Sequence, residues 1–145
     1  MKKNIILGII IVLVIIFIVC FFIKDKIIVR PNSDYVATIY HSQMMGMDAG
    51  WGSTYYFYPT EDESYMWIES KTTITIKGAS KEKDVDSGII KNQNELHNLV
   101  TDIENSKRPD AQQYISYTYI NNGNEEKVGS VEELIEKLFG EIVKD

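Results

Sequence analysis

The sequence predicts an α+β domain, an antiparallel sheet with two helices on one face, carried behind a single N-terminal transmembrane helix. Three observations predict this class. An apolar run lies close to the N-terminus, several later segments alternate apolar and polar residues with a period of two, and two segments repeat apolar residues with a helical period. After the apolar run, the predicted order of elements is β-β-β-α-β-β-α, and runs of strands interrupted by helices are typical of α+β folds.

The apolar run covers residues 5–23, reads IILGIIIVLVIIFIVCFFI and contains no charged side chain. A helix of this length rises about 28 Å, which is close to the thickness of a bilayer's hydrocarbon core. Every direction around that helix is apolar, so no stripe is left to face water. We therefore predict that residues 1–4 form a basic cytoplasmic head and that residues 5–23 span a lipid bilayer.

Two kinds of N-terminal processing compete with a simple anchor. A secretory signal peptide would follow the basic Lys2 and Lys3 with about 7–15 apolar residues and a small-x-small cleavage site. This run is longer and ends in Val19-Cys20-Phe21-Phe22-Ile23, so it indicates an uncleaved signal anchor. Lipidation of Cys20 is the alternative, but bulky Val19 precedes it, and Cys20 is most simply an apolar side chain within the membrane.

The side of the membrane follows from the flanking charges and from the shape of the N-terminus. Lys2 and Lys3 are opposed by Lys24, Lys26 and Arg30 on the other flank, so the basic bias alone is nearly balanced. A short basic head followed at once by an apolar run usually stays inside. We therefore expect a single-pass protein of the cell membrane with an extracytoplasmic C-terminal domain.

Composition limits the compartment and the partners of that domain. Cys20 is the only cysteine, so the domain has no disulfide bond, and this fits a bacterial cell envelope. Without Lys2 and Lys3 the chain has 13 basic and 21 acidic side chains, a net charge of −8. A phosphate backbone requires clustered Lys and Arg, so we expect no nucleic-acid partner.

The strands are predicted from alternation and from turn residues. Residues 24–34 form a juxtamembrane linker broken at Pro31, and the soluble domain covers residues 35–145. Strands are predicted at residues 35–41, 53–58, 65–77, 113–120 and 125–128, and loops at residues 42–52 and 78–88, the second followed by a short edge at 89–90. In the third segment Met66 and Ile68 share the apolar parity, which predicts one half-buried strand or two strands with a bend near Ser70. Asn122-Gly123 predicts a tight hairpin turn.

Each predicted helix has a recognisable start. Asn92 and Glu95 resemble a capping box, and Ser130 and Glu133 form a better one. The first helix then carries an apolar stripe at Leu96, Leu99, Val100 and Ile103, and the second an apolar face at Val131, Leu134, Ile135, Leu138, Phe139 and Ile142.

Patterns that would indicate catalysis or metal binding are missing from the sequence. The chain lacks the histidine spacing of zinc sites, the layout of a calcium loop at residues 61–63 or 82–86, and a phosphate-cradling glycine loop. His41 and His97 are the only histidines, and neither is spaced to activate a nucleophile. We assign no catalytic residue, metal ligand or cofactor. A small envelope hydrolase that pairs one histidine with a carboxylate is the alternative.

The segment with most binding character is residues 44–58, MMGMDAGWGSTYYFY. Flexible methionines beside aromatic rings are common at adaptable protein-binding surfaces. The predicted binding residues are Met44, Met45, Met47, Trp51, Tyr55 and Tyr56. The competing interpretation is a long hairpin loop folded over the sheet, with Trp51 and alternate tyrosines in the core. The sequence thus predicts a non-enzymatic, membrane-tethered interaction domain for a protein partner, and a membrane-bound inhibitor or immunity-type protein is a special case of it.

Overall fold

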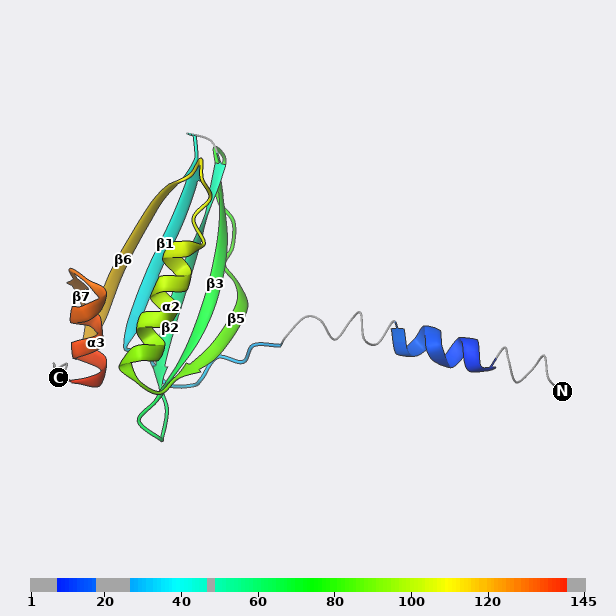
Figure 1. Ribbon diagram of the computed structural model, residues 1–145, viewed down its shortest axis with the longest axis horizontal. Coiled ribbons are helices and arrows are strands. Elements are labelled where there is room, and N and C mark those ends of the chain that lie inside the picture. Colours follow the sequence, from blue (N-terminus) through cyan, green and yellow to red (C-terminus); the bar gives the residue numbers. More distant parts are fainter. Residues whose placement is uncertain (1–7, 18–26, 47–48, 141–145) are drawn as a thin grey trace.

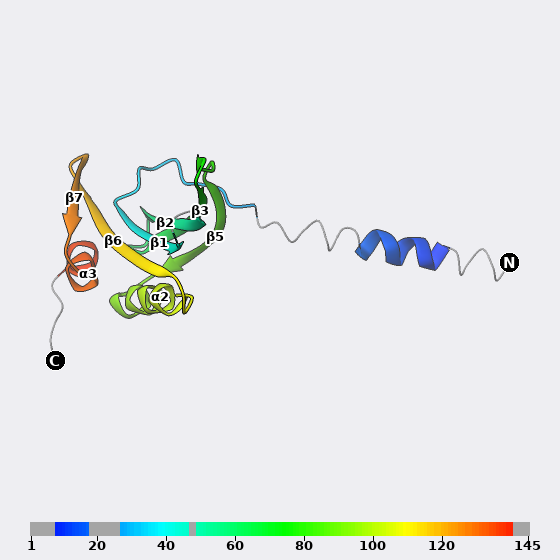
Figure 2. The same cartoon turned by 90° about the horizontal axis from the view of Figure 1, so that it is seen from above.

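The computed structural model describes residues 8–17, 27–46 and 49–140 of the 145-residue chain. It confirms an α+β fold with a curled antiparallel sheet, and Figures 1 and 2 show that sheet with helices α2 and α3 beside it. The elements are β1 (Ala37–Met45), β2 (Ala49–Pro59), β3 (Tyr65–Thr75), β4 (Gly78–Ala79), β5 (Lys83–Ile90), α2 (Gln93–Asn105), β6 (Gln112–Asn121), β7 (Asn124–Val128) and α3 (Val131–Phe139).

Residues 8–17 form an N-terminal helix. Within the described part of the chain, no helix has both the length and the apolar character needed to cross a membrane. Of the predicted span of residues 5–23, residues 5–7 and 18–23 lie outside the described residues. The basic head at residues 1–4 lies outside them too.

The sheet is ordered β4-β3-β2-β1-β6-β7, and β5 also pairs with β3. All pairings are antiparallel, with Ile39 opposite Tyr55 on one side and Tyr117 on the other. Helix α2 connects the edge strand β5 to β6, on the far side of β1. Strand β1 therefore lies inside the sheet, and its alternate side chains face the helices.

One core joins both helices to the same face of the sheet. Ala37, Ile39 and Phe57 from the strands are fully buried, as are Leu96 of α2 and Leu134 of α3. Burying apolar side chains is the main favourable contribution to folding. Helices α2 and α3 thus lie on one face, but the element order from β1 onward is β-β-β-β-β-α-β-β-α and not the predicted β-β-β-α-β-β-α. The opposite face of the sheet, called here the open face, has no described helix over it.

The local signals for helix starts and for the hairpin turn are confirmed. Asn92 caps α2 by accepting a hydrogen bond from the Glu95 amide (3.0 Å), and Ser130 caps α3 by accepting one from the Glu133 amide (3.3 Å). Asn122 and Gly123 have φ values of 50° and 79°, the left-handed pair that a tight hairpin requires. Ile142, the last residue of the predicted α3 stripe, lies outside the described residues.

The two predicted loops are largely wrong. Residues 42–52 mostly belong to strands, because β1 runs to Met45 and β2 starts at Ala49. Residues 78–88 contain β4 and most of β5, so the short edge at 89–90 is only the end of a longer strand. Glycine and charge made both segments resemble loops, yet an edge strand tolerates charged side chains because one of its edges meets water.

The parity of β3 also differs from the expectation. Trp67 and Glu69 face the helices, while Ile68 faces the other way and is still fully buried. A shift in the pairing with β5 lies between Glu69 and Ser70, where the sequence predicted a bend. An apolar residue buried on the open face means that something other than the helices covers it.

Candidate functional site

The predicted binding residues do not gather on one surface. Ile39 of β1 faces the helices, and side chains directly opposite each other point to the same side of the sheet. Tyr55 is opposite Ile39, and Trp51 is opposite Gln43, which has the same parity as Ile39. Met45, Trp51 and Tyr55 therefore lie on the helix-facing side. Met44 and Tyr56 belong to the open face, and Met47 lies outside the described residues. Successive side chains of a strand point to opposite faces of the sheet. The β1–β2 hairpin therefore separates the predicted binding residues, whereas a loop could have placed them on one surface.

On the helix-facing side, the predicted residues take part in packing. Tyr55 is buried, and its hydroxyl donates to Glu69 at 3.1 Å. Trp51 is half-buried beneath Arg108, whose guanidinium carbon lies 4.7 Å from the ring centroid. Tyr55 therefore lies in the core, as the competing interpretation expects. Trp51 lies only at the margin of the core.

The open face carries an aromatic pair, Tyr40 on β1 and Tyr114 on β6. Tyr114 is 58% exposed, and its ring lies 6.4 Å from the ring of Tyr40, on the neighbouring strand. Gly52 of β2 leaves room for Tyr40, because a Cβ there would lie only 3.1 Å from the Tyr40 hydroxyl. The Tyr40 ring therefore lies over the backbone of β2 at a position without a side chain. On β1 and β6 the open-face side chains beside these rings, Ser42, Met44 and Ser116, are uncharged.

The other part of the open face is covered by residues 27–36, called here the strap. Arg30 spans the sheet edge by pairing with both carboxylate oxygens of Asp84, Nε to Oδ2 at 2.9 Å and Nη2 to Oδ1 at 2.7 Å. Nη2 also donates to Ser70 Oγ at 2.8 Å, and the Ser70 hydroxyl bonds Asp84 in turn. These contacts connect residues far apart in the sequence, and they place the predicted linker against the domain.

Aromatic rings line the floor beneath the strap. The Arg30 guanidinium lies 4.8 Å from the centroid of the Tyr56 ring, and Tyr35 packs edge-on against Tyr56 (5.1 Å) and Tyr58 (6.3 Å). Beside them, the Tyr56 hydroxyl donates to both oxygens of Glu82 at 3.2 Å. The strap is thus attached by a charge-assisted fork and by ring contacts.

The charges under the strap are reflected in the pKa values of its partners. The hydrogen bonds from Arg30 lower the pKa of Asp84, and the same pair raises the pKa of Arg30. Burial, with Glu82 nearby, raises the pKa of Tyr56 to about 12. Arg30 and Asp84 therefore stay ionised, and Tyr56 stays neutral, across the physiological range.

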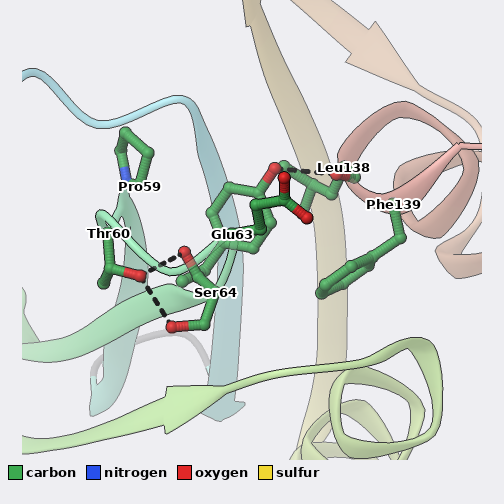
Figure 3. A pocket seen from close by; sticks show the side chains of 7 residues that line it. Pro59, Thr60, Glu63, Ser64, Leu138 and Phe139 are labelled. Carbon is green, nitrogen blue, oxygen red and sulfur yellow. Dashed lines mark hydrogen bonds between the residues drawn. The ribbon is translucent and has the colours of Figure 1, made fainter.

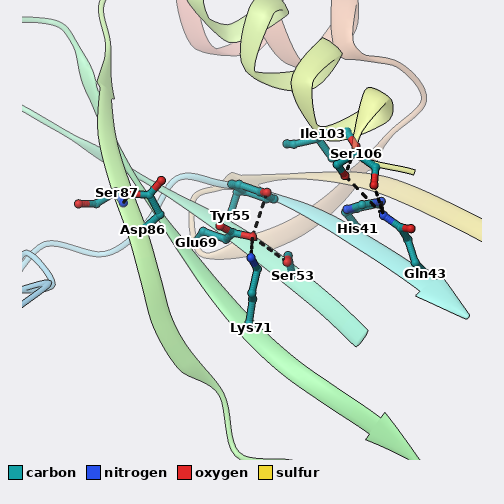
Figure 4. A network of polar contacts seen from close by, with 10 residues as sticks. All are labelled: His41, Gln43, Ser53, Tyr55, Glu69, Lys71, Asp86, Ser87, Ile103 and Ser106. Carbon is teal, nitrogen blue, oxygen red and sulfur yellow. Dashed lines mark hydrogen bonds and ion pairs between the residues drawn. The ribbon is translucent and has the colours of Figure 1, made fainter. Parts of the chain in front are cut away.

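A second polar cluster lies beneath the C-terminal end of α2 and is shown in Figure 4. Gln43 is only 1% exposed, its amide nitrogen donates to the Ser106 carbonyl at 3.1 Å, and its oxygen accepts from the Arg108 amide at 2.9 Å. The last carbonyls of a helix have no partner within the helix. A glutamine from the sheet therefore satisfies the end of α2 and the start of the following loop.

His41 belongs to this cluster. Its ring is 3% exposed, and Nε2 lies 2.9 Å from the amide nitrogen of Gln113, which can donate to an unprotonated Nε2. Burial lowers the pKa of His41, and Glu69 opposes that shift. His97 is exposed on α2. Neither described histidine has a hydrogen bond to a carboxylate, which is the geometry that the hydrolase alternative requires.

Glu69 is the one buried carboxylate of the described sheet that faces the helices. It accepts hydrogen bonds from Ser53 (2.8 Å) and Tyr55 (3.1 Å), and Lys71 Nζ lies 3.3 Å from the same oxygen, as Figure 4 shows. A buried charge is tolerated when it is paired and hydrogen-bonded. Among the described residues no three His, Cys, Asp or Glu side chains are arranged to hold a metal ion.

A shallow hollow of about 360 Å³ lies between the β2–β3 turn and the end of α3 (Figure 3). The Tyr65 hydroxyl donates to the Leu138 carbonyl at 2.7 Å, and its ring packs edge-on against Phe139 at 5.2 Å. Thr60 and Ser64 bond each other within the turn. The hydroxyls of Thr60, Ser64 and Tyr65 thus have partners inside the protein, and the contacts of Tyr65 fasten α3 to the sheet.

Sequence reasoning missed Arg30, Ser70 and Asp84, and it missed Gln43 and Gln113. The only local signal at the strap was an arginine before a proline in a presumed linker. Nothing in the spacing relates Arg30 to Asp84. Neither glutamine gives a signal, because Gln43 lies in the predicted loop of residues 42–52 and a polar residue in a strand, such as Gln113, is ordinarily assigned to the solvent side.

Comparison with known protein families, with curated proteins and with solved structures gave no significant match to this chain.

Proposed function

We propose that this chain is a membrane-tethered, non-enzymatic interaction domain of a bacterial cell envelope, and that it meets a protein partner through its open face. One observation supports this most: helices α2 and α3 cover the same face of the sheet, and on the opposite face beyond the strap Tyr40 and Tyr114 lie together on β1 and β6, whose open-face side chains carry no charge. Interfaces are enriched in aromatic residues and in methionine, and depleted of charge at their centres.

The centre of the proposed surface is formed by Tyr40, Met44 and Tyr114. Tyr40 and Met44 are half-buried on β1, and Tyr114 on β6 is the most exposed of the three. Tyr and Trp are frequent at positions that dominate binding energy, because a large rigid ring loses little conformational entropy. Of the binding residues predicted from the sequence, Met44 belongs to the proposed surface. Tyr55 belongs to the core, and Trp51 lies at its margin.

The tether is supported by the sequence of residues 5–23. We propose that this segment spans the cell membrane once, with residues 1–4 in the cytoplasm and the domain outside. Fractionation with an alkaline wash should leave the full chain in the membrane pellet. Protease added to intact cells should degrade the domain, and release by the wash or full protection from the protease would contradict this placement.

The interaction surface is tested by a substitution on each face. In the full chain, Tyr114→Ser should abolish co-purification of a discrete partner while leaving the unfolding midpoint within a few degrees of wild type, because Tyr114 is largely exposed. Asn98→Ser, at an exposed position on α2, is the matched control and should retain the partner. Equal loss or equal retention in both variants would contradict a role for the open face.

A hydrolase remains a different hypothesis without a specific observation in its favour. His41 contacts glutamine side chains, and the buried carboxylate Glu69 is occupied by Ser53, Tyr55 and Lys71. An inhibitor or immunity-type role fits the same surface as the proposal and differs only in the identity of the partner.

A further inference from the structure

The strap covers part of the open face that would otherwise be accessible. Ile68 is 0% exposed and Tyr58 is 4% exposed, although both point away from α2 and α3. Ser70, two residues from Ile68 on the same side of β3, is bonded directly to Arg30 of the strap. The strap therefore accounts for burial that the helices do not provide.

The strap is attached at few points. Ile27 and Val29 are 89% and 72% exposed, so its first residues contribute little burial. At its other end, the Val36 amide donates to the Phe57 carbonyl at 2.8 Å, where the chain enters β1. Between these ends the polar attachment is the Arg30 fork, supported by the ring of Tyr35. The loss of one side chain should therefore release the middle of the strap.

The side chains that contact Arg30, namely Tyr56, Ser70 and Asp84, form a site suited to binding a guanidinium group, called here the notch. Asp84 accepts two parallel hydrogen bonds, Ser70 accepts a third, and the Tyr56 ring provides a π face beneath the guanidinium. Planar bidentate pairing and stacking are recognition modes that Arg makes and Lys cannot reproduce. The surrounding acidic charge, including Glu82 on the Tyr56 hydroxyl, complements a cation.

We propose that this notch is a binding site for an extended peptide segment carrying an arginine, and that the strap occupies it in cis. An outside segment of that chemistry competes with the strap, and displacement extends the apolar surface to Ile68 and Tyr58. This site concerns the half of the open face under the strap. The arginine site can therefore be tested separately from the protein partner proposed for the half around Tyr114.

Thiol labelling of the full chain in detergent micelles tests the release step. In a Cys20→Ser background, a cysteine is placed at Ile68 and, as the matched control, at Ile39, which is equally buried but lies under the helices. Arg30→Ala should raise the labelling rate for Ile68→Cys about tenfold, the size expected for loss of a charge-assisted fork, and leave Ile39→Cys within about twofold. Tyr58→Cys replaces Ile68→Cys if the latter does not fold.

A free peptide tests the binding site itself. In the Arg30→Ala chain, a synthetic peptide of residues 27–36 at millimolar concentration should restore slow labelling, whereas the same peptide with alanine at the arginine position should not. Millimolar peptide is needed because a short tether gives the strap an effective concentration of that order. Arg30→Lys should protect only partly.

Several results would overturn the proposal. Equal acceleration at positions 68 and 39 would mean that Arg30 only stabilises the whole domain. Unchanged labelling at position 68 would mean that the strap is held elsewhere, and protection by both peptides or by neither would exclude an arginine site. Wild-type labelling that slows as protein concentration rises would place a second copy's strap in the notch, contrary to occupation in cis.

Discussion

Replacing Gln43 by alanine should destabilise the domain more than any surface change nearby. The side chain is almost fully buried and satisfies two backbone groups, the Ser106 carbonyl and the Arg108 amide. Leaving a buried polar group without a partner costs about 1–3 kcal/mol. Because this loop is partly exposed, we take about 1 kcal/mol for each of the two backbone groups. Lost packing adds about 1 kcal/mol, so the free energy of unfolding should fall by about 3 kcal/mol in total.

Denaturant unfolding of the full chain in micelles measures this loss, with Trp51 and Trp67 fluorescence as the signal. Gln112→Ala is the matched control, because Gln112 is exposed on the neighbouring strand β6. The control should change the free energy of unfolding by less than about 0.5 kcal/mol. Hydrogen exchange should also show lost protection at residues 103–108, but not in α3. If Gln43→Ala matched Gln112→Ala in both measurements, Gln43 would not support the end of α2.

Three further predictions concern pH, capping and packing. Because burial lowers the pKa of His41, the folded state binds fewer protons than the unfolded chain, so stability present above pH ~6.5 should be lost as the pH falls. His41→Gln should reduce this slope in denaturation curves, and parallel curves for both proteins would contradict the prediction. Ser130→Ala removes the cap of α3 and should cost about 1 kcal/mol in thermal unfolding, whereas Ser130→Asp should retain most of it. Gly88→Ala places a Cβ 2.7 Å from the Trp67 indole nitrogen, so it should lower the free energy of unfolding by about 1–3 kcal/mol and shift the Trp67 fluorescence emission. In the control Gly129→Ala, the nearest atom lies 3.4 Å from the new Cβ, so neither the stability nor the emission should change.

Local signals predicted the helices and the hairpin turn well. A cap is recognisable because its partners are three residues apart, as at Asn92–Glu95 and Ser130–Glu133. The Asn122-Gly123 turn is recognisable because few residues adopt its backbone angles without strain. Each of these features depends on a few neighbouring residues, so a single sequence is sufficient to find it.

Features that depend on distant residues were not predictable. Strand β5 contains charges and a glycine, and it is a strand because β3 offers it a free edge and Asp84 is held by Arg30. The sequence predicts a linker at the strap, because the contacts of Arg30 lie 40 and 54 residues away along the chain. The division of Met44 from Met45 between two faces also depended on the length of β1, which the glycines of β2 obscured.

Site-specific photo-crosslinking in intact cells tests the central claim most directly, namely that the open face of the tethered domain receives a protein partner. A photoreactive amino acid is placed at Tyr114 on the open face or at Asn98 on α2, both exposed. We predict a discrete crosslinked species from position 114, absent at position 98 and lost when Met44→Ser is added. Crosslinks of equal yield from both positions, or a species at 98 alone, would contradict the proposed interaction surface.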